Sequence, residues 1–166
     1  IRGIYPKQIN ESVIEQIAKA ISIKCDNEKV SEICIGRDGR LSGKSLIDSL
    51  STSLSQYGLN VINIGLVTTP LLYFAAKKNT YKSGVMITGS HNPKEYNGFK
   101  IVINNSSFKE EDIQNLKFKI EQSDFKIGSG KLLKESLNES YIREISKKIE
   151  IKKKLKIVLD CGNGSG

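Results

Sequence analysis

Strand-like apolar runs that end in glycine-rich loops alternate along this chain with segments of helical periodicity. The runs "SEICIG", "NVINIG", "GVMI" and "FKIVIN" have the length and composition of β-strands. The continuous run "GVMI" is typical of a strand that is covered on both faces. Strands that alternate with helices of about a dozen residues predict βαβ units. We therefore expect an α/β domain of three layers, in which a mainly parallel, mixed sheet lies between helices.

The helices are predicted from apolar residues that recur every three or four positions. The first stripe follows a candidate N-cap, Asn10, and consists of Ile14, Ile17, Ala18 and Ile21. The second ends at Tyr57 and Gly58, with the glycine in the usual C′ position, and consists of Leu46, Ile47, Leu50 and Leu54.

Three further helices are expected downstream. One opens at Thr69-Pro70, read as an N-cap and a first-turn proline, and runs through Ala76. Another starts from the capping-box spacing of Ser107 and Glu110 and continues through Ile113, Leu116 and Ile120. The last follows the turn signals of "DFKIGSGKLL" and is marked by Ile142, Ile145 and Ile149.

The end of the chain has the pattern of a new domain. The segment "KIVLD" reads as a strand that opens into the glycine-rich turn "CGNGSG", and such a turn predicts a further helix. We expect a first domain over residues 1–134, followed by a linker helix and the truncated start of a second domain over residues 135–166. The same turn could begin a dinucleotide site, with Gly162, Gly164 and Gly166 as G-x-G-x-G, but this short pattern is weak.

Three polar loops follow predicted strands, namely "GRDGR", "GLVTTP" and "TGSHNP". In open α/β sheets ligands bind at the carboxyl ends of the strands, so these loops are expected to converge on one site. The loop "GRDGRLSG" lacks the G-K-[ST] ending of a nucleotide-binding P-loop. It is either a phosphate-binding loop or, as we slightly favour, a structural turn whose arginines pair with acidic neighbours.

Composition narrows the class of protein. The 166 residues carry a net charge of +8, which suits an anionic partner, but the charge comes mostly from lysines scattered along the chain. A basic nucleic-acid-binding domain therefore stays an alternative that rests on charge alone. We see no apolar run of about 18 residues and no signal peptide, so a cytoplasmic protein is expected. Cys25, Cys34 and Cys161 are predicted to be small buried side chains.

The stretch "GVMITGSHNPKEYNGFKI", residues 84–101, contains the only histidine. Ser90 follows Gly89, whose missing Cβ lets another group approach the backbone, and Pro93 stiffens the turn. An ordinary turn is the simple alternative. A serine hydrolase is disfavoured because G-x-S-x-G is absent, and because neighbouring side chains of an extended segment point to opposite faces, which places His91 poorly to deprotonate Ser90.

Phosphoryl transfer fits these residues better than acyl transfer. A phosphate on Ser90 adds a charge of about −1.5 to −2 and needs cations nearby. His91 is then a donor to the bound anion or an orienting group, although it could also be a structural histidine. The basic side chains on candidate loops and strands are Arg2, Arg37, Arg40, His91 and Lys100.

The motif "GVMITGSHNPKEYNGFKIV" resembles the phosphoserine loop of the α-D-phosphohexomutases, most closely the bacterial phosphomannomutase/phosphoglucomutase branch. Gly89 points the same way, because phosphoglucosamine mutases usually carry alanine there. Other segments match the family in order: "IRG", "GRDGRLSG", "GLVTTPLLYFAA" and "IVLDCGNGSG". The resemblance covers nearly the whole chain.

The resemblance implies a four-domain enzyme that interconverts hexose 6-phosphate and hexose 1-phosphate through a bisphosphorylated sugar. Ser90 would be the phosphoserine, and its phosphate one ligand of Mg²⁺. Arg2 and Lys100 match basic residues near the reacting oxygens, and His91 matches the histidine beside the phosphoserine. A phosphoglucosamine mutase is the alternative within the family.

The family's remaining magnesium ligands, sugar-binding loop and phosphate clamp belong to later domains that this chain does not include. We therefore expect the chain alone to be inactive. The resemblance implies a phosphosugar partner, with hexose 1,6-bisphosphate as intermediate or activator, and neither a nucleic acid nor a membrane. Sugar preference and oligomeric state are left open.

Overall fold

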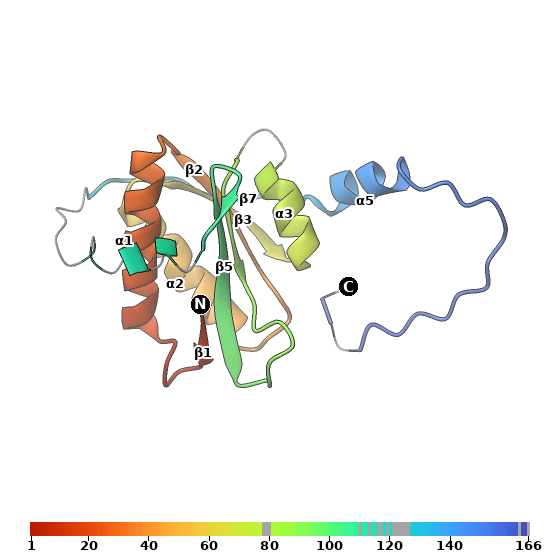
Figure 1. Cartoon of the computed structure of the whole chain (residues 1–166), viewed down its shortest axis with the longest axis horizontal. Coiled ribbons are helices and arrows are strands. Elements are labelled where there is room, and N and C mark those ends of the chain that lie inside the picture. Colours follow the sequence, from red (N-terminus) through yellow and green to blue (C-terminus); the bar gives the residue numbers. More distant parts are fainter. Residues whose placement is uncertain are drawn as a thin grey trace.

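The computed structural model describes residues 1–77, 81–109, 111–112, 114–115, 118, 120, 127–162 and 164–165. Its centre is a seven-stranded sheet of order β1-β5-β4-β2-β3-β7, with β6 beside β5 (Figure 1). The strands are β1 (Arg2–Ile4), β2 (Glu32–Arg37), β3 (Asn60–Leu66), β4 (Gly84–Ile87), β5 (Tyr96–Ile103), β6 (Ser106–Ser107) and β7 (Leu132–Lys134). The helices that the structure describes from end to end are α1 (Glu11–Asn27), α2 (Gly43–Gln56), α3 (Thr69–Lys77) and α5 (Asn138–Ser146).

The strand directions confirm a mainly parallel, mixed sheet. β2 pairs in parallel with both β3 and β4, and β3 pairs in parallel with β7. β5 is antiparallel to β4, β1 and β6, so it alone among the described strands runs against the others. The short strands β1, β6 and β7 were not predicted, because two or three residues are too few to show a period of two.

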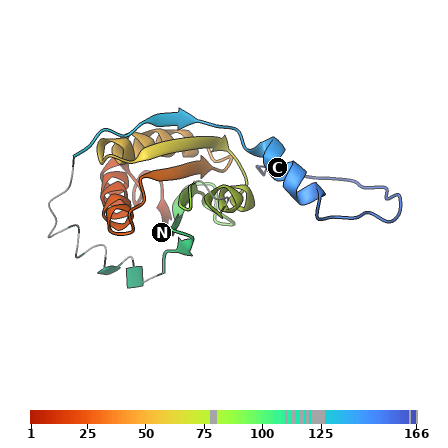
Figure 2. The same cartoon turned by 90° about the horizontal axis from the view of Figure 1, so that it is seen from above.

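The sheet lies between two hydrophobic cores, which gives the three predicted layers. α1 and α2 cover one face and α3 covers the other, as Figures 1 and 2 show. The side chains of β2 alternate between the faces: Ile33 and Ile35 enter the core under α1 and α2, and Cys34 enters the core under α3. All four residues of β4 are buried, so the prediction of a strand covered on both faces is confirmed.

The helix boundaries follow their predicted caps with one correction. The side chain of Asn10 accepts a hydrogen bond from the Val13 N–H at 3.1 Å, and Gly58 ends α2 with φ at +86°. Thr69 is the first residue of α3 rather than its cap, because the Leu72 N–H already donates to the Thr68 carbonyl at 3.2 Å. Within the described residues no helix is long and apolar enough to cross a membrane.

Some predictions for the later part of the chain are corrected or fall elsewhere. The helix expected after Ser107 depends on Glu110, Ile113 and Leu116, which lie outside the described residues. α5 begins after Leu137, which is buried, and its Tyr141 ring packs edge-on against Phe74 of α3 with centroids 5.3 Å apart. The stripe predicted for this helix faces solvent instead: Ile142, Ile145 and Ile149 are exposed.

The strand predicted over residues 156–160 is not formed. A strand needs a neighbour to accept its backbone hydrogen bonds, and the described structure places no strand beside this segment. Ile157, Val158 and Leu159 are therefore largely exposed.

The cysteines differ in environment, and this predicts their reactivity. Cys25 and Cys34 are buried as expected, and burial raises the pKa of each thiol to about 12, whereas Cys161 is exposed, which corrects the prediction for that residue. The thiolate is the reactive form, so at pH 8 an aromatic disulfide reagent should label Cys161 within minutes and the other two only after unfolding. Rapid labelling of all three thiols in the folded protein would contradict this assignment.

The same pKa shifts predict how stability depends on pH. In the unfolded chain the two buried thiols lose their protons at a lower pH than in the folded protein, so the free energy of unfolding should fall as the pH rises from about 9 to about 12.

Candidate functional site

Three loops meet at the carboxyl ends of β2, β3 and β4, as the sequence predicted. Together with Gly162, Gly164 and Ser165 near the end of the chain, they line an open cavity of about 860 Å³. Its walls include Asp38 and Arg40 after β2, Thr68 and Thr69 after β3, and Ser90 and Asn92 after β4. Because β5 runs antiparallel to β4, the third of these loops, residues 88–95, turns the chain back over the sheet edge. We call this segment the serine loop.

The backbone of Ser90 is unusual for a residue other than glycine. Its φ is +54°, in the left-handed region, and such a conformation costs free energy that surrounding contacts must offset. The Ser90 N–H donates to Thr88 Oγ1 at 2.8 Å, and the Asn92 N–H donates to the Gly89 carbonyl at 3.0 Å. Thr88 is buried, whereas Ser90 is exposed. The serine loop thus presents the Ser90 hydroxyl to solvent from a fixed backbone.

His91 lies closer to Ser90 than expected. We predicted side chains on opposite faces, but Ser90 Oγ and His91 Nδ1 are 3.4 Å apart. The prediction was wrong because it assumed extended backbone, whereas the left-handed φ of Ser90 turns the two side chains to the same side. The separation is long for an O–H···N hydrogen bond, yet short enough for His91 to contact a group on the Ser90 oxygen.

Arg40 lies beneath the serine loop. Its guanidinium donates to the backbone carbonyls of the loop, Ser90 included, and its Nε is 3.4 Å from the Asp38 carboxylate. The structural interpretation of "GRDGRLSG" is therefore confirmed for Arg40. The expectation that Gly89 allows a close approach is also confirmed, since a Cβ at this position would lie 2.2 Å from Arg40 Cζ.

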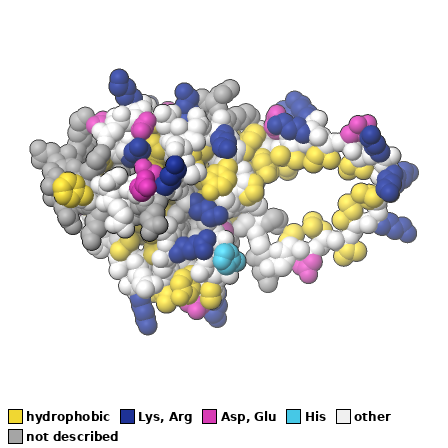
Figure 3. Space-filling view, in the orientation of Figure 1, with side chains coloured by type: hydrophobic (Ala, Val, Ile, Leu, Met, Phe, Trp, Pro, Cys, Tyr) yellow, Lys and Arg dark blue, Asp and Glu magenta, His cyan; other side chains and the backbone are white. Residues whose placement is uncertain are grey.

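The two remaining candidate cations lie in different places. Arg2, on β1, donates from Nη1 to the Asn92 side-chain oxygen at 3.0 Å and so contacts the serine loop. Lys100 lies opposite Met86 in the β4–β5 pairing and lines a separate hollow of about 210 Å³ with Ile1 and other residues. Of the candidate residues, His91 therefore belongs to the serine loop and Arg2 contacts it, whereas Lys100 lines a separate hollow. In Figure 3 the single histidine, in cyan, lies at the surface beside Lys and Arg side chains.

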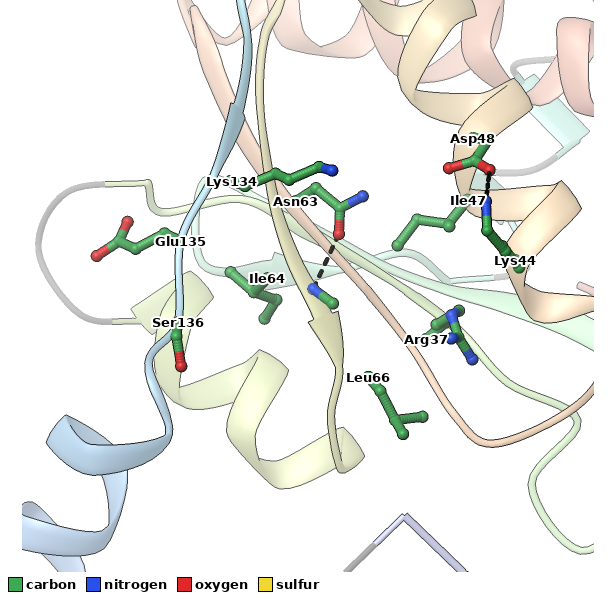
Figure 4. A pocket seen from close by; sticks show the side chains of 11 residues that line it. Arg37, Lys44, Ile47, Asp48, Asn63, Ile64, Leu66, Lys134, Glu135 and Ser136 are labelled. Atoms are coloured by element: carbon green, nitrogen blue, oxygen red, sulfur yellow. Dashed lines mark hydrogen bonds and ion pairs between the residues drawn. The ribbon is translucent and has the colours of Figure 1, made fainter.

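A second hollow, of about 480 Å³, lies between the start of α2, the end of β3 and the segment after β7 (Figure 4). Arg37 lines this hollow and donates to the Asp38 carbonyl at 3.0 Å. Lys44 pairs with Asp48 at 2.7 Å, and the Asn63 side chain accepts from the Gly65 N–H at 2.8 Å. Arg37 therefore belongs to a different surface from Ser90.

The described side chains around the serine loop offer few ligands for a metal ion. In the part of the chain that the structure describes, no three His, Cys, Asp or Glu side chains are grouped closely enough to hold an ion. Among the described residues, two carboxylates line the cavity: Asp38, which is paired with Arg40, and Glu95, which belongs to the serine loop. Mg²⁺ takes about six oxygen ligands, so Ser90, bare or phosphorylated, fits as one ligand of a larger set.

The chain matches a known protein family over most of its length. The family model described as phosphoglucomutase/phosphomannomutase, alpha/beta/alpha domain I, matches residues 1–127. The chain belongs to the phosphoglucomutase/phosphomannomutase family. The resemblance noted from "TGSHNP" and its flanking motifs is confirmed, and the α/β fold agrees with that of the family's first domain.

Individual members of the phosphoglucomutase/phosphomannomutase family show how much of such a protein is present. A phosphomannomutase/phosphoglucomutase of Pseudomonas putida is 41% identical over 99% of this chain and 36% of its own length. A phosphoglucomutase of Neisseria meningitidis is 40% identical over the whole chain and 36% of its own length. A crystal structure of a family protein from Burkholderia thailandensis superposes with a TM-score of 0.87 at 32% identity, over 92% of this chain and 35% of the other. The chain spans about a third of these relatives.

Proposed function

We propose that the full-length protein carrying this chain is a phosphohexomutase that interconverts hexose 6-phosphate and hexose 1-phosphate. The sugar is mannose, glucose or both, and the intermediate is a hexose 1,6-bisphosphate. Residues 1–134 would form the first domain, and residues 135–166 the linker helix and the start of the second. This chain alone would be inactive, and the enzyme would act on its phosphosugar in the cytoplasm.

One observation carries the proposal. The Ser90 hydroxyl is exposed at the wall of the cavity, on a left-handed backbone that Thr88 and Arg40 hold in place. Phosphoryl transfer depends mostly on positioning and on neutralising the phosphoryl oxygens, so a fixed hydroxyl with cations nearby suits it. The relatives' names, which are those of mutases, support the same reaction.

The reaction balances with a phosphorylated Ser90. The bond between Ser90 Oγ and phosphorus breaks while a sugar hydroxyl oxygen bonds to phosphorus and loses its proton to a base, and Ser90 Oγ takes up a proton. The other phosphoryl group of the bisphosphate then returns to Ser90 Oγ, which gives up its proton, and the leaving sugar oxygen gains one. Both transfers conserve the number of phosphoryl groups, so no oxidant or second substrate is needed.

The chain's own residues would contribute charge and orientation. Arg2, which bonds Asn92 of the serine loop, and His91, 3.4 Å from Ser90 Oγ, would contact phosphoryl oxygens. Lys100, which lines the hollow beside Ile1, would contact the sugar. Mg²⁺, when bound, would neutralise the phosphoryl oxygens, with the phosphate on Ser90 as one ligand and the others supplied by a later domain.

Peptide mapping of the full-length protein tests this proposal. After incubation with glucose 1,6-bisphosphate and Mg²⁺, digestion and mass spectrometry should find one phosphate on the peptide that contains Ser90. Phosphate on another serine, with none on Ser90, would exclude the proposed role. Turnover of mannose 1-phosphate and glucose 1-phosphate should exceed that of glucosamine 1-phosphate, and the reverse order would favour the phosphoglucosamine alternative.

A further inference from the structure

The Arg40 guanidinium donates four hydrogen bonds in one place and also forms an ion pair. Nε faces the carboxylate of Asp38, which also accepts the Arg40 backbone N–H at 3.1 Å. The four remaining donors bond backbone carbonyls: Pro93 at 2.5 Å and Tyr96 at 2.7 Å from Nη1, and Asn92 at 2.6 Å and Ser90 at 3.0 Å from Nη2. The Arg40 side chain itself is only 14% exposed, although the bonds to Ser90 and Pro93 reach the exposed side of the turn.

A lysine at position 40 could not form the same set of hydrogen bonds. The guanidinium is a rigid planar fork with five donors, whereas a lysine ammonium has three donors around a single atom. Carbonyls of a partly buried turn need partners, and Arg40 is the partner of four carbonyls between Ser90 and Tyr96. The serine loop is therefore tied to the loop after β2 through one residue.

Gly89 makes the approach possible. A Cβ at position 89 would lie 2.2 Å from Arg40 Cζ and 2.3 Å from its Nε, far inside van der Waals contact. The guanidinium could not move aside without losing its carbonyl partners. The Arg40 guanidinium can therefore occupy its position only because residue 89 has no side chain.

We propose that Arg40 is a positioning residue that orients Ser90 for phosphoryl transfer without touching the substrate. The inference rests on the proposed role of Ser90. Its physical basis is separate: Arg40 bonds the Ser90 carbonyl and Thr88 bonds the Ser90 N–H, so the Ser90 backbone between them is held in the left-handed conformation. Without Arg40 the Ser90 backbone is expected to relax toward more populated dihedral angles and to turn the hydroxyl away.

Hydrogen exchange of the full-length protein tests the structural part whether or not the protein is a mutase. In Arg40→Lys, amides of residues 88–96 should exchange about tenfold faster or more, because hydrogen bonds to a charged donor are lost. Amides of α1 should be unchanged. Arg143→Lys, the same substitution on an exposed face of α5, is the matched control and should leave residues 88–96 as in the wild type. Unchanged exchange in the serine loop, or equal acceleration in α1, overturns the proposal.

Steady-state kinetics test the functional part. Arg40→Lys should lower kcat by about 10- to 100-fold, because a misplaced nucleophile reacts slowly, with KM within about threefold of the wild-type value. A larger rise of KM with unchanged kcat would assign Arg40 to substrate binding and overturn the proposal. If the wild type shows no mutase activity, the proposed function fails, while the exchange experiment still decides whether Arg40 holds the loop.

Discussion

Replacement of Ser90 by alanine is expected to lower kcat of the full-length protein by about 10³-fold or more, because loss of a covalent nucleophile has effects of this size or larger in other enzymes. No neighbouring side chain can take its place. Thr88 is buried, and its hydroxyl already accepts the Ser90 N–H at 2.8 Å. The substitution removes only an exposed oxygen, so folding should be preserved. The measurement is conversion of glucose 1-phosphate and mannose 1-phosphate in the presence of Mg²⁺ and the bisphosphate.

The matched control for this experiment is Ser31→Ala. Ser31 is an exposed serine that precedes β2, at the end of the sheet opposite the serine loop, so its hydroxyl is remote from the cavity. This variant should keep the wild-type kcat and the wild-type phosphopeptide. Full turnover by Ser90→Ala would show that phosphate does not pass through Ser90, whatever the control does.

The elements that depend on local patterns could be predicted from the sequence. α1 and α2 have apolar stripes and recognisable ends, such as the Asn10 side chain on Val13 and the left-handed Gly58. The convergence of three loops followed from the parallel strands that precede them. Ser90 was found in the same way, because a serine after a strand end and a glycine lies where ligands gather.

Features that depend on contacts between distant residues could not be predicted. Nothing near Arg40 in the sequence indicates that its guanidinium bonds carbonyls about fifty residues later, and only the unexplained need for a small residue at Gly89 hinted at a neighbour. The 3.4 Å contact between Ser90 and His91 depends on one backbone angle that a serine rarely adopts. For residues 156–160 the sequence predicted a strand that the structure does not contain. The composition favours a strand, but a strand also requires a neighbouring strand to pair with.

Replacement of Gly98 by alanine is expected to separate β1 from β5 and to lower kcat at least tenfold. A Cβ at position 98 would lie 2.2 Å from the Ile1 carbonyl oxygen, and backbone at this distance cannot rotate away as a side chain could. The chain must shift, which disrupts the pairing of Arg2 with Gly98 and the hydrogen bond from the Phe99 N–H to Ile1 at 2.9 Å. Arg2 would then lose its contact with Asn92 of the serine loop.

Hydrogen exchange of residues 1–5 measures this displacement directly, and the kinetic loss should accompany it, because a cation moved by about 1 Å stabilises the transferring phosphoryl group less well. Gly39→Ala is the matched control for the exchange experiment. A Cβ at position 39 would meet no atom within 4 Å, so residues 1–5 should keep their wild-type protection in that variant. If residues 1–5 exchange at the wild-type rate in Gly98→Ala, β1 accommodates the methyl group, and the close approach at Gly98 is not what holds Arg2 beside the serine loop.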